Sequence, residues 1–158
     1  MLRFLLGAYH TAERWVDLLR SPALLIFRVW VFWQLFQAGM GKLQDISTPI
    51  AFFTKLHIPF PVANAWLVAC VEAFGSVLIM VGLFARLAAI PITISMIVAY
   101  ITADFAAWSS FLTDPDKFEG AAPFLFLLGA LAILFFGPGK ISLDYLLSFL
   151  AGKKAGEG

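Results

Sequence analysis

A single carboxylate lies in the middle of an apolar stretch, and it is the residue of this chain best placed to do chemistry. Glu72 is the only charged residue in VANAWLVACVEAFGSVLIMVGLFA, residues 62–85. An isolated acid at the centre of a bilayer costs a few kcal/mol and is by default a functional residue. We therefore expect Glu72 to be neutralised, paired with a cation or used in the function.

Other polar side chains fall at the same depth in the membrane. At a helical rise of about 1.5 Å per residue, Gln34 and Glu72 each lie about 18 Å from one membrane surface, and Tyr100 lies about 20 Å from it. Gln37 is one turn beyond Gln34 on the same helix face. The sequence therefore predicts a central polar cluster, in which Glu72, Gln34, Gln37, Tyr100 and Arg28 bind a ligand or exchange protons.

Three interpretations of Glu72 remain open at this stage. It could be a protonated acid that hydrogen-bonds to Gln34 or Tyr100 and joins two helices. It could form an ion pair with Arg28, which lies about 9 Å nearer the cytoplasmic surface. It could also be a functional acid in a cavity, where it carries protons or binds a polar ligand head.

The composition decides the class of protein. Of 158 residues, 61% are apolar and only 13% are charged, whereas a soluble domain carries about 25% charged residues. The net charge of +1 gives no indication of a nucleic-acid partner. Cys70 is the only cysteine, and His10 and His57 fall on opposite sides of the membrane. We therefore predict an integral membrane protein with no metal site and no obligatory cofactor.

Four apolar segments are long enough to cross a bilayer, which takes about 20 residues. Because backbone groups in lipid must be satisfied internally, all four are expected to be helices. The predicted fold is all-α, with a four-helix membrane domain over residues 23–146 and spans at residues 24–40, 62–84, 88–105 and 121–136. Residues 1–22 are predicted to form an amphipathic interfacial helix. A short amphipathic helix starts after Ser142, and residues 147–158 form a tail.

The distribution of lysine and arginine predicts the orientation. Eight basic residues fall on one side of the predicted spans and three on the other. The first side carries Arg3, Arg14, Arg20, Arg28, Arg86, Lys140, Lys153 and Lys154, and the second carries Lys42, Lys55 and Lys117. The positive-inside rule then places both termini in the cytoplasm of a bacterium, with the chain crossing the inner (plasma) membrane several times. Lys42 and Asp104 fall near the outer surface and are predicted to pair.

Five short stretches, in this order, resemble the DoxX family of four-helix membrane proteins. They are Arg28, GMGK at 39–42, Glu72, VGLFAR at 81–86 and GPGKISLD at 137–144. The resemblance covers about residues 24–146. It implies that the family's recurrent positions are Arg28, Gly39, Lys42, Glu72, Gly82, Arg86, Gly137, Pro138, Gly139 and Asp144. Asp104 stands where many members have a histidine. The resemblance also implies an association with membrane redox complexes, including one linked to thiosulfate:quinone oxidoreductase.

The favoured function is a subunit or accessory of a quinone-linked redox system, whose central cluster binds a quinone or lipid-like ligand. One alternative is a structural subunit that docks on a larger complex through residues 2–20. The other is a small proton-coupled transporter in which Glu72 titrates. Expected partners are membrane lipid, a membrane protein or second copy of the chain, and a quinone. No catalytic residue is predicted, and catalysis by the isolated chain is not expected.

Overall fold

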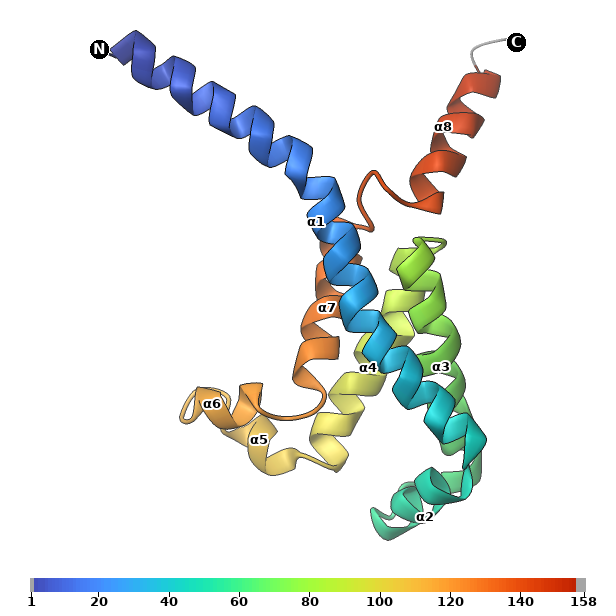
Figure 1. Ribbon diagram of the computed structural model, residues 1–158. Helices are drawn as coiled ribbons and strands as arrows, with labels where there is room; N and C mark the ends of the chain where they lie inside the picture. Colours follow the sequence, from blue (N-terminus) through green and yellow to red (C-terminus); the bar gives the residue numbers. More distant parts are fainter. Residues whose placement is uncertain (1, 156–158) are drawn as a thin grey trace.

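The computed structural model describes residues 2–155, and side chains are described for residues 21–150. Every element in residues 2–155 is a helix. Four helices pack side by side as a bundle (Figure 1). They are α1 (Leu2–Gln44), α3 (Pro61–Val81), α4 (Ala85–Thr102) and α7 (Phe124–Phe136).

Three helical segments are long and apolar enough to cross a membrane: Ser21–Gln44 within α1, α3 and α4. The fourth apolar helix, α7, has 13 residues, which is about 20 Å at the usual helical rise. It is shorter than the predicted span at 121–136 because Pro123 precedes it. A proline disfavours helical geometry in the residue before it, so the helix begins after Pro123. The all-α membrane fold is confirmed, and α7 alone falls short of a full span.

Helix α1 runs without interruption through the predicted boundary at residue 22. It is 43 residues long and has Pro22 inside it. A proline inside a helix removes one backbone hydrogen bond and commonly bends the helix, and α1 changes direction along its length in Figure 1. The predicted amphipathic face belongs to residues 1–22, and the side chains of residues 1–20 lie outside the described ones.

The connections divide between the two ends of the bundle (Figure 1). One end, which we call the α2 end, carries α2 (Ser47–Lys55), α5 (Phe105–Ser109) and α6 (Pro115–Glu119). The other, which we call the termini end, carries the α3–α4 turn, the 137–142 loop and α8 (Leu143–Ala155). Helix α1 begins and α8 ends at this same end.

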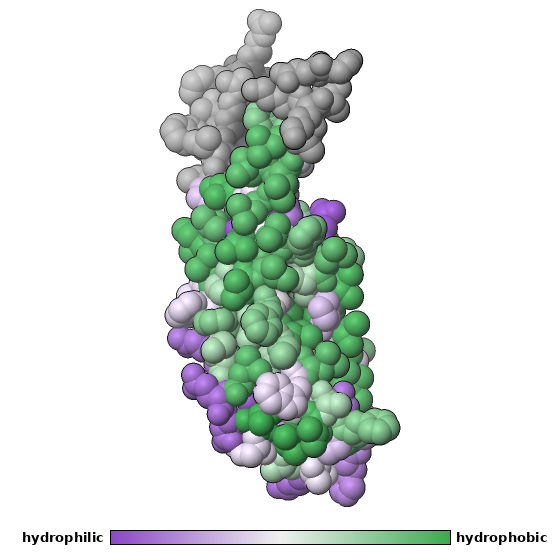
Figure 2. All heavy atoms as spheres, turned by 90° about the vertical axis from the view of Figure 1, so that its right-hand side faces the viewer, coloured by the Kyte–Doolittle hydropathy of each residue, from purple (hydrophilic) through white to green (hydrophobic). Residues whose placement is uncertain are grey.

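The bundle combines close helix contacts with large exposed apolar side chains. Small residues, among them Ala69 and Ala73 of α3 and Ala89 of α4, are completely or almost completely buried, which lets helix backbones approach closely. Large apolar side chains such as Phe74 and Ile94 are more than half exposed. Figure 2 shows apolar residues over the middle of one face and polar residues toward the α2 end. This distribution is that of a surface in contact with lipid.

Candidate functional site

An ion pair between α1 and α3 holds the acid that the sequence singled out. The ammonium Nζ of Lys42 donates to both carboxylate oxygens of Glu72, at 2.6 Å each. The Glu72 side chain is 4% exposed and that of Lys42 is 33% exposed. Gly39 brings the two helices together, because a Cβ there would lie 2.5 Å from the backbone nitrogen of Ala73. The backbones therefore touch one turn before Lys42.

This pairing corrects two predictions. Lys42 was expected to pair with Asp104, and Glu72 with Gln34, Tyr100 or Arg28, whereas Lys42 and Glu72 pair with each other. The predicted depths of the polar side chains in the membrane assume that each helix has an ordinary tilt. The contact of Gly39 with Ala73 instead sets the last turn of α1 beside the middle of α3. Lys42 is consequently deep enough to reach Glu72.

The other members of the predicted central cluster face elsewhere. Gln34 and Gln37 are exposed on α1, and the amide of Gln34 makes only a long contact, 3.4 Å, with the carbonyl of Trp30. Tyr100 is fully buried and donates to the carbonyl of Phe118 at 2.8 Å. Among the described residues none of these three hydrogen-bonds to Glu72, so the cluster does not form around it.

Arg28 joins three parts of the chain at the termini end. Its guanidinium is 1% exposed and donates to three backbone carbonyls. The acceptors are Met80 at 3.1 Å, Pro138 at 2.6 Å and Ile141 at 3.0 Å. Arg28 therefore fixes the 137–142 loop to α1 and to the end of α3, and does not face Glu72.

Asp144 completes this junction from the start of α8. Its carboxylate accepts from the backbone nitrogens of Phe84, at 2.8 Å, and Ala85, at 3.1 Å. Its own backbone nitrogen donates to the carbonyl of Gly82 at 2.8 Å. A carboxylate at the first turn of a helix satisfies free N–H groups and complements the helix dipole. Asp144 therefore caps α4.

Loss of this cap should be measurable. Replacing Asp144 with alanine is expected to lower the free energy of unfolding by about 1 to 2 kcal/mol, the range for a lost N-cap. Thermal unfolding of the purified protein in detergent measures the change. Asp116→Ala, at an exposed acid of α6, is the matched control and should change stability little. Equal effects of the two substitutions would show that the cap contributes nothing.

The residues that carried the sequence resemblance gather in two places. Gly39, Lys42 and Glu72 form the α1–α3 contact, and the remaining recurrent positions lie at the termini end. Ser142, which the sequence marked only as a helix cap, accepts from the backbone nitrogen of Tyr145 at 3.2 Å and packs directly on Gly82. The Gly-Pro-Gly sequence at 137–139 is the feature of the sequence that could have indicated this junction. It predicts a non-helical loop, and the carbonyls of such a loop are free to accept hydrogen bonds from an arginine.

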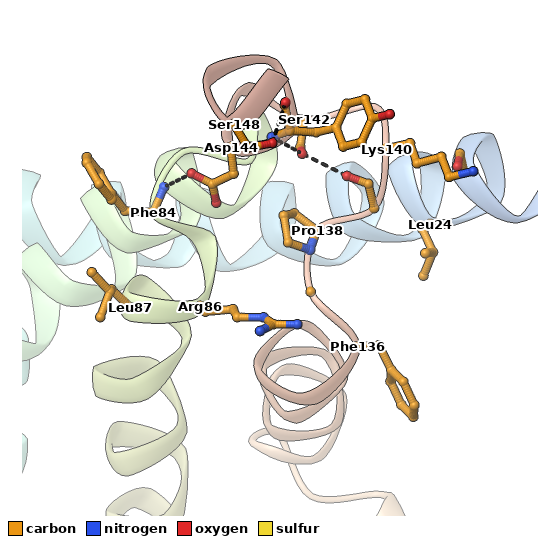
Figure 3. Close-up of a pocket in the computed structure, with 14 residues that line it drawn as sticks. Leu24, Phe84, Arg86, Leu87, Phe136, Pro138, Lys140, Ser142, Asp144 and Ser148 are labelled. Carbon is orange, nitrogen blue, oxygen red and sulfur yellow. Dashed lines mark hydrogen bonds between the residues drawn. The ribbon is translucent and has the colours of Figure 1, made fainter. Parts of the chain in front are cut away.

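Two cavities lie beside this junction. The larger, of about 730 Å³, is lined by basic Arg86 and Lys140, by the hydroxyls of Ser142 and Ser148, and by apolar side chains that include Phe136 (Figure 3). The smaller, of about 610 Å³, is bounded by Arg28, Ile141 and the first turns of α8. Neither cavity could be predicted from the sequence, because the walls of each come from several separate segments of the chain.

Comparison with known proteins identifies the family of the chain. The DoxX family model matches residues 23–105, which include both partners of the ion pair. The uncharacterized membrane protein Rv3486 of Mycobacterium tuberculosis (strain ATCC 25618 / H37Rv) is 31% identical over 124 residues, covering 71% of this chain and 66% of that protein. No solved structure matches the chain. The chain is a multi-pass membrane protein and belongs to the DoxX family.

Proposed function

We propose that this protein is a subunit or accessory of a quinone-linked redox system in the bacterial inner membrane, with both termini in the cytoplasm. In this proposal the Lys42–Glu72 pair binds a quinone or lipid-like ligand. The observation that carries it is an ion pair in which a lysine side chain, one third exposed, is held by a buried carboxylate, within a segment long enough to span the membrane. Polar groups in such segments mark functional sites by default.

The chemistry of the pair defines the kind of ligand. A lysine ammonium has three N–H donors, and the contacts to Glu72 use two of them. The third can donate to a carbonyl oxygen. Because the pair has no net charge, the ligand should have an uncharged polar head on an apolar body, as a quinone does. Ser76, one turn further along α3, is fully buried, and its hydroxyl has no partner among the described residues.

Exposed amides support the idea of a subunit. Gln34 and Gln37 lie on the outer face of α1, within the segment long enough to span the membrane. Amide side chains in lipid are stabilised when a neighbouring helix hydrogen-bonds them. A membrane-protein partner, or a second copy of the chain, would supply those bonds.

Equilibrium dialysis of the full-length protein in detergent against a short-chain benzoquinone or naphthoquinone tests the ligand site. We expect saturable binding to the wild type and an affinity about tenfold lower for Lys42→Met, as for the loss of one charge-assisted hydrogen bond. The double variant Lys42→Met/Glu72→Gln removes both charges together and leaves no unpaired acid. Lys55→Met, at an exposed lysine of α2, is the matched control.

Two results would contradict the proposal. One is the absence of saturable quinone binding to a wild type that unfolds cooperatively. The other is equal affinity of the Lys42→Met and Lys55→Met proteins. Proton flux into liposomes without quinone, abolished by Glu72→Gln, would instead favour the transporter alternative.

A further inference from the structure

The larger cavity at the termini end contains the side chains of two basic residues, Arg86 and Lys140. Arg86 and Lys140 are exposed, and neither donates a hydrogen bond to the residues whose side chains are described. Figure 3 shows Arg86 extended across the cavity floor beneath Pro138. A Cβ on Gly137 would lie 3.1 Å from Nη2 of Arg86 and 3.3 Å from its Nε. Glycine at this position therefore leaves room for the flat guanidinium against the loop.

The other charged groups near the cavity already have partners. The carboxylate of Asp144 lines the cavity but accepts from the backbone nitrogens of Phe84 and Ala85. Arg28 lies behind the loop and donates to three carbonyls. Among the residues whose side chains are described, two cations with free donors thus face one acid whose carboxylate already accepts two hydrogen bonds. The cavity is suited to an anion.

Apolar side chains form another part of the wall, at a membrane boundary. Phe84, Leu87 and Phe136 are 57%, 64% and 70% exposed. They stand where α4 begins and α7 ends, at the ends of the apolar helices, where lipid headgroups lie. An occupant of this cavity would therefore meet cations at its head and apolar side chains along its body.

We propose that this cavity binds the phosphate group of an anionic phospholipid, with an acyl chain against Leu87 and Phe136. The planar guanidinium of Arg86 matches two phosphate oxygens, and Lys140 adds a second positive charge. Basic pockets between membrane helices bind anionic headgroups in this way. The site is separate from the Lys42–Glu72 pair, so phospholipid binding here does not depend on quinone binding there.

Lipid retention tests the proposal on the full-length protein. The chain is reconstituted in vesicles of equal parts phosphatidylcholine and phosphatidylglycerol, solubilised gently and examined by native mass spectrometry for retained lipid. We expect the wild type to retain phosphatidylglycerol in preference to phosphatidylcholine. Arg86→Gln and Lys140→Gln should each lower that preference about fivefold, the expected effect of one basic residue at an anionic surface. Lys55→Gln, with the same charge change at the α2 end, should leave it unchanged.

One further variant and a second ligand make the outcome decisive. Arg86→Lys keeps the positive charge but cannot make a bidentate contact with phosphate. It should show a preference for phosphatidylglycerol between those of the wild type and Arg86→Gln. Lys140→Gln alters an exposed loop residue and serves if Arg86→Gln unfolds. Equal preference in wild type, Arg86→Gln and Lys140→Gln would overturn the proposal. Saturable binding of inorganic phosphate to the protein in vesicles of phosphatidylcholine alone, together with loss of retained phosphatidylglycerol when phosphate is added to the mixed vesicles, would overturn the lipid assignment in favour of free phosphate.

Discussion

Replacing Arg28 with methionine is expected to lower the free energy of unfolding by about 3 to 5 kcal/mol, the range for removing one partner of a buried charged contact. The guanidinium is 1% exposed and donates to the carbonyls of Met80, Pro138 and Ile141. Methionine fills much of the same volume but leaves the three acceptors without a donor, and each buried unpaired group costs about 1 to 3 kcal/mol. The variant no longer buries a positive charge, and this gain offsets part of the cost of the three unpaired carbonyls.

Arg86→Met provides the matched control for Arg28→Met. Arg86 is exposed at the same end of the bundle, so its loss should change stability by less than about 0.5 kcal/mol in detergent free of anionic lipid. Reversible unfolding followed by helical circular dichroism measures both variants. Similar destabilisation by the two would show that the three carbonyl contacts do not hold the fold together.

The Arg28→Met defect should also be local. Because Arg28 fixes the 137–142 loop, its loss should release Asp144 from the start of α4. Hydrogen exchange at the amides of Phe84 and Ala85 should then become faster, since both amides donate to Asp144. Amides of α5 and α6, at the α2 end of the bundle, should exchange at unchanged rates.

The helices could be predicted from the sequence because lipid imposes a strong constraint on the backbone. An apolar stretch in a bilayer has to satisfy its own N–H and C=O groups, so hydropathy alone indicates where helices lie. Two of the differences from the predicted helices occur at prolines. Pro123 delayed the start of α7, whereas Pro22 lies inside a continuous α1. Proline therefore marks the start of one helix and lies inside another, and hydropathy does not predict which of the two will happen at a given proline.

The partners of the polar residues were harder to predict, for a geometric reason. Depth is one coordinate, whereas a contact also depends on rotation about each helix and on the register between helices. Gly39 against Ala73 sets that register, and nothing in the sequence says which glycine of GMGK is in contact. The sequence predicts side-chain partners for Arg28, whereas its acceptors are all backbone carbonyls. Every residue has a backbone carbonyl, so no sequence pattern indicates which ones an arginine will contact.

The two glycines of GMGK therefore give the sharpest test of the α1–α3 contact. Gly39→Ala is expected to lower the free energy of unfolding by about 2 to 3 kcal/mol, the upper part of the range for overpacking. The added Cβ would lie 2.5 Å from the nitrogen and 2.9 Å from the Cα of Ala73. Those are backbone atoms, so no side chain can turn aside and the helices themselves have to separate.

Gly41→Ala is the control within the same helix. A Cβ there meets nothing within 4 Å, so the substitution should stabilise the helix by about 0.5 to 1 kcal/mol through its intrinsic propensity. Opposite signs for the two variants in thermal unfolding are the expected result, and the same sign would show that the helices do not touch at Gly39. Separation of the helices would also draw Lys42 away from Glu72. Gly39→Ala should therefore weaken quinone binding while Gly41→Ala leaves it intact, which ties the function of the pair to the register that one glycine sets.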